Sequence, residues 1–291
     1  MLQEWYAAYK SNVDEAIEEY FIKRYAVVSR SPEEKRFEEA LRYAVMTPGK
    51  RLRPILAMIA YEEFAEISGD RVLPYFIGLE MIHAYSLVHD DLPVIDNDEL
   101  RRGQPTVWKR YDEATAILVG DALQIMGIEC LAQSDNIKVI VEISWAIGDM
   151  GMVRGQIRDV MIDATSLNQD EMLRLHDEKT GRLISSSLII GALTAGVYEG
   201  QMFDRLRLFG ILLGRAFQIR DDILDYEGQI ESLGKAVGKD IANKKGVVSY
   251  MGIDRTKKLL QDLEHELIDI AKSFHTSKFI DIVEYVLRRE K

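Results

Sequence analysis

The chain has 291 residues, of which 47% are hydrophobic, so it is long enough to bury a sizeable core. Its formal net charge of -11 argues against a nucleic-acid partner, because a nucleic-acid binder should carry a basic stripe. Cys130 is the only cysteine, which excludes an intramolecular disulfide and indicates a reducing compartment.

The N-terminal segment has no basic stretch followed by an apolar one, so we expect no signal peptide. We also see no apolar run of about 20 residues, the length that spans a bilayer. These features predict a cytoplasmic protein without stable membrane insertion.

Apolar residues recur at helical spacing along most of the chain. The segment SPEE at 31–34 combines an N-cap serine, a proline at the first helical position and a capping-box glutamate, and Pro48-Gly49 ends the helix that it begins. No stretch shows sustained period-two alternation, and no linker divides the chain. We therefore predict an all-α fold in one domain over 1–291. The other predicted helices span roughly 2–25, 51–66, 72–91, 112–133, 137–163, 169–198, 202–226 and 254–289.

Two long polar connections, 97–107 and 227–247, interrupt these helices. Both are rich in Gly, Asp and Lys or Arg. Loops of this length in a helical domain are often functional lids.

Two aspartate clusters, about 130 residues apart, each stand in an apolar stretch: HDDLPVID at 89–96 and RDDILD at 220–225. Crowded carboxylates raise one another's pKa unless a cation compensates them. Mg²⁺ accepts such oxygen ligands and completes its coordination with water and substrate phosphates. The pair of clusters therefore predicts a clamp around a phosphorylated substrate, although solvated helix-end carboxylates are the alternative.

Helix geometry distinguishes the two clusters. The three aspartates of the second are three or four residues apart and share one helix face. Asp90 and Asp96 are six apart and would diverge by about 120° on a straight helix. Pro93 ends or bends that helix, which we expect to return Asp96 toward Asp90.

Basic segments accompany the clusters. GKRLRP at 49–54 places cations at a helix start, where free N–H groups and the helix dipole favour phosphate. RRG at 101–103 follows the first cluster, KTG at 179–181 interrupts a helical run, and Lys235 and Lys239 follow the second cluster. Each is more often a surface charge when alone, so their joint occurrence carries the prediction of an anion site.

With these segments in this order, the chain resembles the trans-isoprenyl diphosphate synthase (polyprenyl synthetase) family, and within it the bacterial-type farnesyl diphosphate synthases. The matching segments are GKRLRP at 49–54, MIHAYSLVHDDLPVIDNDELRRGQPT at 81–106, GDAL at 120–123, GQIRD at 155–159, KTG at 179–181 and FQIRDDILD at 217–225. The resemblance implies the isoprenoid synthase fold, a bundle of long helices around a deep central cavity, and a homodimer.

The resemblance also implies roles for individual residues. Three Mg²⁺ ions would be bound by Asp90, Asp91, Asp96, Asp221, Asp222 and Asp225. Isopentenyl diphosphate would be held by Lys50, Arg53, His83 and Arg102, with Arg51 nearby. The allylic diphosphate would be addressed by Arg101, Lys179, Gln218 and Lys235. Oxygen dipoles that stabilise the cation would come from Thr180, Gln218 and the carbonyl of Lys179.

The implied reaction is Mg-assisted ionisation of dimethylallyl or geranyl diphosphate to an allylic carbocation, which isopentenyl diphosphate attacks head to tail. The implied product is (E,E)-farnesyl diphosphate. Tyr85, five residues before Asp90 and about 7.5 Å along the helix, is predicted to limit product length together with Ser86 beside it. Straight-helix geometry favours Ser86, whereas bulk and the resemblance favour Tyr85; an ordinary core tyrosine is the alternative.

Other functions share part of this pattern. A geranylgeranyl or longer-chain synthase has every catalytic motif. A class I terpene cyclase needs no GKRLRP segment, and a non-catalytic regulatory subunit tends to lose aspartates, none of which is missing here. The segment NKKGVVSY at 243–250 departs from the family's Lys-Ser/Thr-Thr-Tyr-like pattern, so its lysine stays unassigned, and the basic ending at 288–291 is expected to help close the site.

Overall fold

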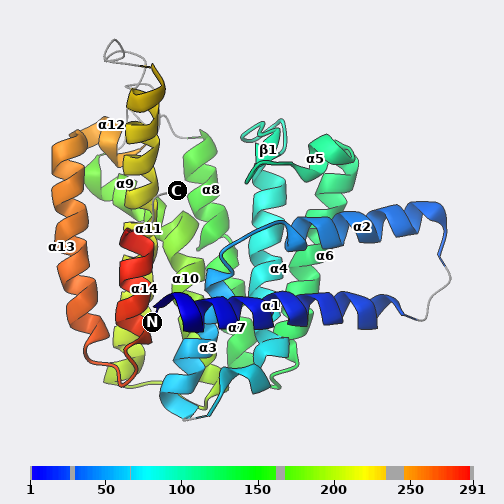
Figure 1. Ribbon diagram of the computed structural model, residues 1–291, viewed down its shortest axis with the longest axis horizontal. Coiled ribbons are helices and arrows are strands. Elements are labelled where there is room, and N and C mark those ends of the chain that lie inside the picture. The colour runs from blue at the N-terminus through cyan, green and yellow to red at the C-terminus, as the bar shows by residue number, and fades with distance from the viewer. Residues whose placement is uncertain (1, 27–29, 66, 162–167, 234–245, 289–291) are drawn as a thin grey trace. The chain divides into compact units, whose positions relative to one another are not determined.

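The computed structural model describes residues 2–26, 30–65, 67–161, 168–233 and 246–288. The regular secondary structure of these residues is helical apart from one short hairpin, which confirms the predicted all-α class (Figure 1). Apart from the first two residues, the chain forms two compact units. The first comprises 3–141 and 193–195, and the second comprises 142–192 and 196–291.

The first unit contains the N-terminal helices. They are α1 (Leu2–Tyr25), α2 (Pro32–Met46), α3 (Leu52–Ala65), η1 (Gly69–Arg71), α4 (Leu73–Asp90), α5 (Val107–Arg110), α6 (Glu113–Ala132) and the first half of α7 (Ile137–Ile147). The capping box predicted for α2 is present, because Ser31 Oγ accepts the Glu34 N–H at 3.3 Å and the Glu34 carboxylate accepts the Ser31 N–H at 2.8 Å.

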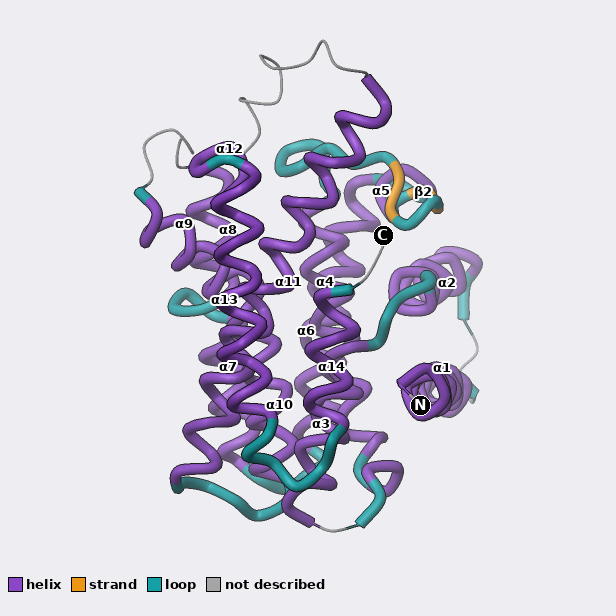
Figure 2. The backbone as a smooth tube through the Cα atoms, turned by 60° about the vertical axis from the view of Figure 1, so that its left-hand side comes forward, coloured by secondary structure: helices purple, strands orange, loops and turns teal. Residues whose placement is uncertain are grey.

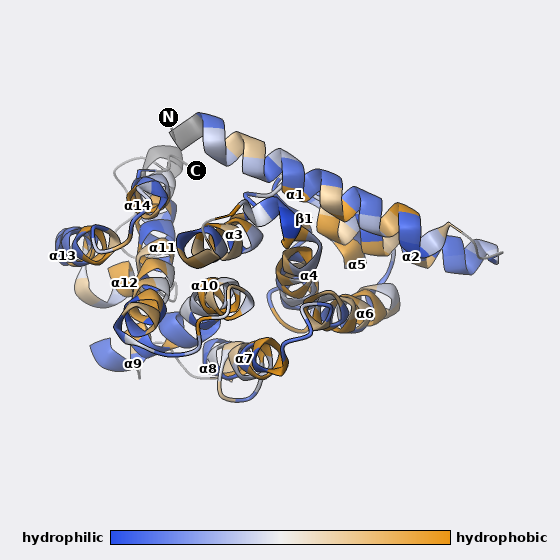
Figure 3. Cartoon of the chain, turned by 90° about the horizontal axis from the view of Figure 1, so that it is seen from below, coloured by the Kyte–Doolittle hydropathy of each residue, from blue (hydrophilic) through white to orange (hydrophobic). Residues whose placement is uncertain are grey.

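Helices α4 and α6 form the apolar centre of the first unit and are coloured orange along much of their lengths in Figure 3. Glycines let the two backbones touch: a Cβ at Gly78 would lie 2.4 Å from the Gly127 carbonyl oxygen, and a Cβ at Gly127 would lie 2.6 Å from that of Gly78. By length and composition α6 could cross a membrane, so the expectation that no such run exists was wrong. The same composition is typical of a core helix, and α6 packs along α4 in that way.

The second unit contains the remaining helices. They are the end of α7, α8 (Met152–Met161), α9 (Gln169–His176), the π-helical turn η3 (Asp177–Gly181), α10 (Arg182–Thr194), α11 (Gln201–Leu233), α12 (Val247–Met251), α13 (Ile253–Ala271) and α14 (Lys278–Leu287). Helices α11, α13 and α14 lie side by side, and an aromatic cluster of Phe209, Phe274 and Phe279 joins them, with the last two rings stacked at 4.2 Å.

Three predicted helices are divided in the structure. The run at 137–163 breaks between α7 and α8 around Gly148 and Gly151, and the run at 169–198 contains the π-helical turn η3. The run at 254–289 divides into α13 and α14, whereas α11 continues past 226 to Leu233. Apolar periodicity continues through each interruption, so the pattern alone did not reveal it.

The polar connection 97–107 contains a hairpin of two short strands, β1 (Leu100–Arg101) and β2 (Gln104–Pro105), shown in orange in Figure 2. Its turn residues Arg102 and Gly103 have left-handed φ values of 53° and 76°. Two consecutive positive φ angles match the twist of a two-residue hairpin. Arginine at the first position hid this turn from sequence reasoning.

Candidate diphosphate and metal sites

The first aspartate cluster folds back on itself at the end of α4. The helix ends at Asp90, and the Asp96 N–H donates to the Asp90 carbonyl at 3.0 Å. The Asn97 N–H, on a residue with a φ of 54°, donates to the Leu92 carbonyl at 3.1 Å. These bonds return the chain after Pro93, which confirms the predicted approach of Asp96 to Asp90 at the level of the backbone.

Asp91 points into the first unit and is paired with Arg101. Only 3% of Asp91 is exposed, and Arg101 Nε donates to its Oδ1 at 2.7 Å. Burial raises the pKa of Asp91 above its ordinary value, and Arg101 opposes this shift only in part. Arg101 also reaches Asp98 at 3.3 Å. In this structure the Arg101 guanidinium therefore orients the aspartate cluster.

Three basic side chains, Arg53, His83 and Arg102, gather near this cluster. Burial, together with the charges of Arg53 and Arg102, lowers the pKa of His83 well below its ordinary value. Burial also lowers the pKa of Arg53 to about 10, and Arg53 Nε is buried without a hydrogen-bond partner among the described residues. A buried guanidinium nitrogen left unsatisfied is costly, so this group is built to receive an anion. The structure thus brings Arg53, His83 and Arg102 together.

Two glycines, Gly49 of the GKRLRP segment and Gly120 of the GDAL segment, lie close to side chains of the site. A Cβ at Gly49 would lie 2.4 Å from Arg102 Nη1, which itself donates to the Pro48 carbonyl at 2.8 Å. A Cβ at Gly120 would lie 2.0 Å from His89 Nε2, which contacts the Ile117 carbonyl at 3.0 Å. At Gly49 the nearest atoms are the ends of the flexible Arg102 and Arg51 side chains, which can move aside, whereas at Gly120 an added Cβ would collide with the His89 imidazole ring.

The expected chain-length residues lie one turn before the first cluster. Tyr85 is 6% exposed, its ring meets His89 edge to face at 5.9 Å, and its hydroxyl has no partner among the described residues. Burial raises the pKa of Tyr85 to about 12. Ser86 is half-buried and donates to the His83 carbonyl at 2.9 Å.

In the second unit, α11 carries the second aspartate cluster. Asp222 Oδ2 accepts the Val247 N–H at 2.9 Å, and Gln218 Nε2 donates to Asp222 Oδ1 at 3.4 Å. Thr180 Oγ1 in turn donates to Gln218 Oε1 at 3.4 Å. Burial raises the pKa of Asp222 to about 6, to which Asp221 and Asp225 contribute. A nearby cation would relieve this cost, and the structure brings Thr180 and Gln218 onto the same cluster.

The KTG segment forms the last three residues of the π-helical turn η3, and single π-helical turns are often found at functional sites. Glycines allow the backbones of two helices to come close to this turn. A Cβ at Gly155 on α8 would lie 2.3 Å from the Lys179 nitrogen, and a Cβ at Gly214 on α11 would lie 2.4 Å from the Gly181 Cα. Lys179 Nζ lies 2.5 Å from Asp159 Oδ2, the last residue of the GQIRD segment. The turn and α8 therefore fix the position of Lys179 together.

Sequence reasoning gave no role to two residues beside this turn. Asp159 was noted only within its motif, although it holds Lys179. His176 is buried, with Nε2 4.0 Å from Asp222 Oδ2, and burial lowers its pKa to about 4. A lone histidine carries no signal, whereas the charge pattern between the GQIRD and KTG segments could have suggested the ion pair. Lys235, residues 243–245 and residues 289–291 lie outside the described residues.

Among the described residues, no three histidine, cysteine, aspartate or glutamate side chains converge on a point that could hold a metal by themselves. Mg²⁺ usually takes one or two carboxylates and completes its octahedron with water and phosphate oxygens. The crowded carboxylates of each cluster, with the raised pKa values of Asp91 and Asp222, fit an ion held together with a diphosphate.

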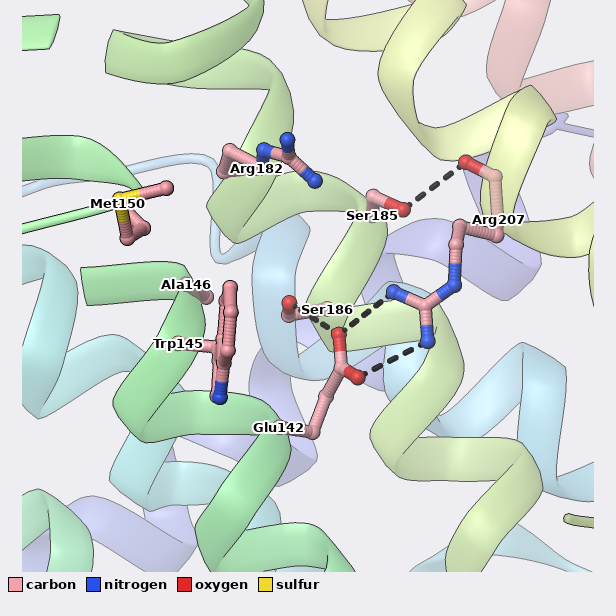
Figure 4. A pocket seen from close by; sticks show the side chains of 8 residues that line it. All are labelled: Glu142, Trp145, Ala146, Met150, Arg182, Ser185, Ser186 and Arg207. Atoms are coloured by element: carbon pink, nitrogen blue, oxygen red, sulfur yellow. Dashed lines mark hydrogen bonds and ion pairs between the residues drawn. The ribbon is translucent and has the colours of Figure 1, made fainter. Parts of the chain in front are cut away.

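A separate pocket of about 130 Å³ lies between α7, α10 and α11 of the second unit (Figure 4). Arg207 donates twice to Glu142, with both bonds at 2.9 Å, and Ser186 Oγ donates to Glu142 at 2.6 Å. The pocket is also lined by Trp145, Ala146, Met150, Arg182 and Ser185. Because Arg207, Glu142 and Ser186 satisfy one another and no aspartate of either cluster lines the pocket, it is not the candidate active site.

Comparisons with known proteins agree with these motifs. The polyprenyl synthetase family profile matches residues 34–285. The farnesyl diphosphate synthase of Micrococcus luteus is 38% identical over 268 residues, which cover 89% of this chain and 91% of the relative. The large subunit 1 of a heterodimeric geranylgeranyl pyrophosphate synthase of Arabidopsis thaliana is 35% identical over 283 residues, with coverage of 91% and 75%.

A crystal structure of a Helicobacter pylori geranyltransferase, complexed with magnesium and isoprenyl diphosphate, superimposes with a TM-score of 0.77. It is 30% identical, and the comparison covers 96% of this chain and 94% of that one. The chain therefore belongs to the polyprenyl synthetase family and is a trans-prenyl diphosphate synthase with the isoprenoid synthase fold.

Proposed function

We propose that the protein condenses isopentenyl diphosphate head to tail with dimethylallyl or geranyl diphosphate and releases (E,E)-farnesyl diphosphate. The observation that carries this proposal is the group of Arg53, His83 and Arg102, in which Arg53 Nε is buried without a hydrogen-bond partner among the described residues, in the same unit as the first aspartate cluster. A diphosphate would neutralise this group and supply the oxygen acceptors that it lacks.

We propose that isopentenyl diphosphate occupies this group, with Lys50 from the preceding loop. Burial and the neighbouring arginines lower the pKa of His83, which keeps its ring neutral at pH 7, so His83 would donate a hydrogen bond without adding charge. The arginines would supply the charge. Arg51 is not among the proposed diphosphate ligands, because its guanidinium already forms ion pairs with two carboxylates, Asp14 and Glu80.

The allylic diphosphate would be addressed from the other segments. Lys179, fixed by Asp159, is the proposed cation of the second unit, and Lys235 is proposed from the family motif alone. Arg101 would contribute by orienting Asp91 and by facing the same diphosphate. Thr180 and Gln218 would turn oxygen dipoles toward the developing carbocation, and the apolar surroundings would exclude water.

The six aspartates would bind Mg²⁺, as the magnesium complex of the Helicobacter pylori relative supports, and we propose three ions. When bound, the metal would stabilise the negative charge that develops on the departing diphosphate. The proposed ligands are Asp90, Asp91, Asp96, Asp221, Asp222 and Asp225.

Tyr85 is the proposed limit on product length. Its ring is buried one turn before the first aspartate cluster, and its hydroxyl has no partner in the described part of the chain, so bulk is the property that it contributes there. The farnesyl-making relative of Micrococcus luteus supports a C15 product. The geranylgeranyl relative of Arabidopsis thaliana supports the alternative of C20.

We also propose a cytoplasmic homodimer whose subunit is one domain over 1–291. Among the described residues of α6, Ile117, Leu118 and Ile125 are exposed, and several large apolar side chains exposed on one helix favour contact with a protein partner. Both aspartate clusters are complete, which supports a catalytic chain over a regulatory subunit.

Product analysis tests the proposed function. Purified protein is incubated with Mg²⁺, isopentenyl diphosphate and each of the C5, C10 and C15 allylic diphosphates, and the dephosphorylated products are separated by chromatography. The proposal expects C15 from the C5 and C10 substrates and little extension of the C15 substrate. Efficient conversion of the C15 substrate to C20 or longer would instead assign a longer-chain synthase, and no condensation would refute the activity.

A further inference from the structure

The loop that carries Lys50 is held by ion pairs of the next residue, Arg51, with carboxylates of α1 and α4. Arg51 is 3% exposed, its Nε donates to Asp14 Oδ1 of α1 at 2.7 Å, and its Nη1 donates to Glu80 Oε1 of α4 at 2.9 Å. Lys10, one turn earlier on α1, holds the other oxygen of Asp14 at 2.6 Å. The Arg51 guanidinium is therefore enclosed by two carboxylates from two different helices.

The loop backbone is also held at its neighbouring residues. Tyr6 of α1 donates its hydroxyl proton to the Lys50 carbonyl at 2.6 Å, and Arg102 donates to the Pro48 carbonyl at 2.8 Å. Arg51 itself has a φ of 52°, a left-handed conformation that is uncommon for a residue with a side chain and that surrounding contacts must maintain. Two contacts from α1 therefore fix a strained turn between two proposed diphosphate ligands, Lys50 and Arg53.

Helix α1 precedes residue 34, where the match to the family profile begins. Its hydrogen bonds nevertheless end on Lys50 and Arg51, in the same GKRLRP segment as Arg53. We infer that α1 is a positioning element of the isopentenyl diphosphate site, with Asp14 acting through Arg51 and Tyr6 acting through the Lys50 carbonyl. Arg51 serves here as a positioning residue and does not contact the diphosphate. This inference rests on the proposed function and adds residues outside the family motifs to it.

The direction in which Asp14→Asn changes the affinity for isopentenyl diphosphate distinguishes a positioning role of Arg51 from direct binding. Asp14→Asn keeps the size and shape of the side chain but removes its negative charge, so Arg51 loses a charged partner. If Arg51 positions the loop, isopentenyl diphosphate binds more weakly. If Arg51 were itself a ligand, the loss of a competing carboxylate would leave more positive charge for the diphosphate, and binding would become tighter.

The experiment compares three variants of α1 in the full chain. Asp14→Asn and Tyr6→Phe each remove one tether of the loop. Asn12→Ala is the matched control, because Asn12 lies on the same helix and its side-chain amide donates at 2.8 Å to Asp70, a residue outside the loop. The dissociation constant of isopentenyl diphosphate is measured by calorimetry without Mg²⁺ or allylic substrate, and both KM values are measured during turnover.

The expected result is a rise on the order of tenfold in the dissociation constant and KM of isopentenyl diphosphate for Asp14→Asn, and a smaller rise for Tyr6→Phe. The KM for geranyl diphosphate and the behaviour of Asn12→Ala should stay close to wild type. Tighter or unchanged isopentenyl diphosphate binding in Asp14→Asn, or an equal loss in Asn12→Ala, would overturn the inference. A wild-type protein that neither binds nor consumes isopentenyl diphosphate would instead refute the proposed function.

Discussion

Gly155 is the point at which α8 meets the turn that carries Lys179. A Cβ at this position would lie 2.3 Å from the Lys179 nitrogen, 2.5 Å from its Cα and 2.8 Å from the Glu178 carbonyl carbon. Real Cβ contacts are essentially never shorter than 3.0 Å, and all three neighbours are backbone atoms. In Gly155→Ala the backbones of α8 and η3 must therefore separate, by roughly 1 Å, because interiors are close-packed.

Two measurable effects follow. Overpacking of this kind typically costs about 1–3 kcal/mol of stability. Lys179 and its partner Asp159 lie on the two segments that separate, so their 2.5 Å ion pair is disturbed as well. A displacement of about 1 Å in a substrate-positioning group can cost on the order of 100-fold in rate. We expect a raised KM for the allylic substrate and a kcat lowered by about 10- to 100-fold.

The assay combines denaturant unfolding with steady-state kinetics. Gly228→Ala is the matched control, because Gly228 lies in α11, no neighbouring segment in the described part of the chain comes within 4 Å of its added Cβ, and Ala in a helix should stabilise by about 0.5–1 kcal/mol. A Gly155→Ala protein with wild-type stability and allylic kinetics would refute the claim that this close approach fixes Lys179.

Three further predictions concern single side chains. Truncation of Arg53 or His83 should raise the KM of isopentenyl diphosphate more than that of the allylic substrate, and truncation of Lys179 should do the reverse; equal effects in steady-state kinetics would show that the two sites are wrongly divided. Tyr85→Ala should open space for one more isoprene unit and shift products to C20 or longer, so a variant that still stops sharply at C15 would exclude Tyr85 as the limit. The pKa of His176 is about 4 in the folded protein and about 6.5 for an ordinary histidine. Between these two pH values the unfolded chain therefore binds a proton that the folded protein does not bind. The wild type should therefore lose up to about 3 kcal/mol more stability than His176→Gln between pH 6.5 and 4, and parallel unfolding curves for the two proteins would contradict this.

The sequence predicted those features that depend on local pattern. Helical spacing and the capping box located most helices of the first unit, and Pro93 correctly predicted the return of Asp96 toward Asp90. The positions of Thr180 and Gln218 beside the second aspartate cluster also agree with the resemblance. These features need only a few neighbouring residues or an ordered set of motifs.

Features that depend on contacts between distant segments were missed. The π-helical turn at Lys179 lies where glycines of α8 and α11 bring the backbones of these helices close to it. The sequence pattern did not reveal this turn, because one added residue leaves the helical periodicity almost unchanged. The hairpin turn at Arg102 uses positive φ at a residue that rarely adopts it. The ion pairs of Arg51 with Asp14 and Glu80 were also missed, because these partners lie 37 and 29 residues away in the sequence.

The most direct test of the account is the turnover of Asp90→Ala and Asp221→Ala with isopentenyl and geranyl diphosphates at saturating Mg²⁺. The two aspartates represent the two clusters, and Asp204→Ala, an exposed aspartate at the start of α11, is the control. The account predicts that kcat falls at least ~100-fold in both variants, about 2.7 kcal/mol of transition-state stabilisation, while circular dichroism shows an intact fold and Asp204→Ala keeps its activity. Near-normal turnover in either cluster variant would contradict the proposal that both aspartate clusters hold the metal ions against the departing diphosphate.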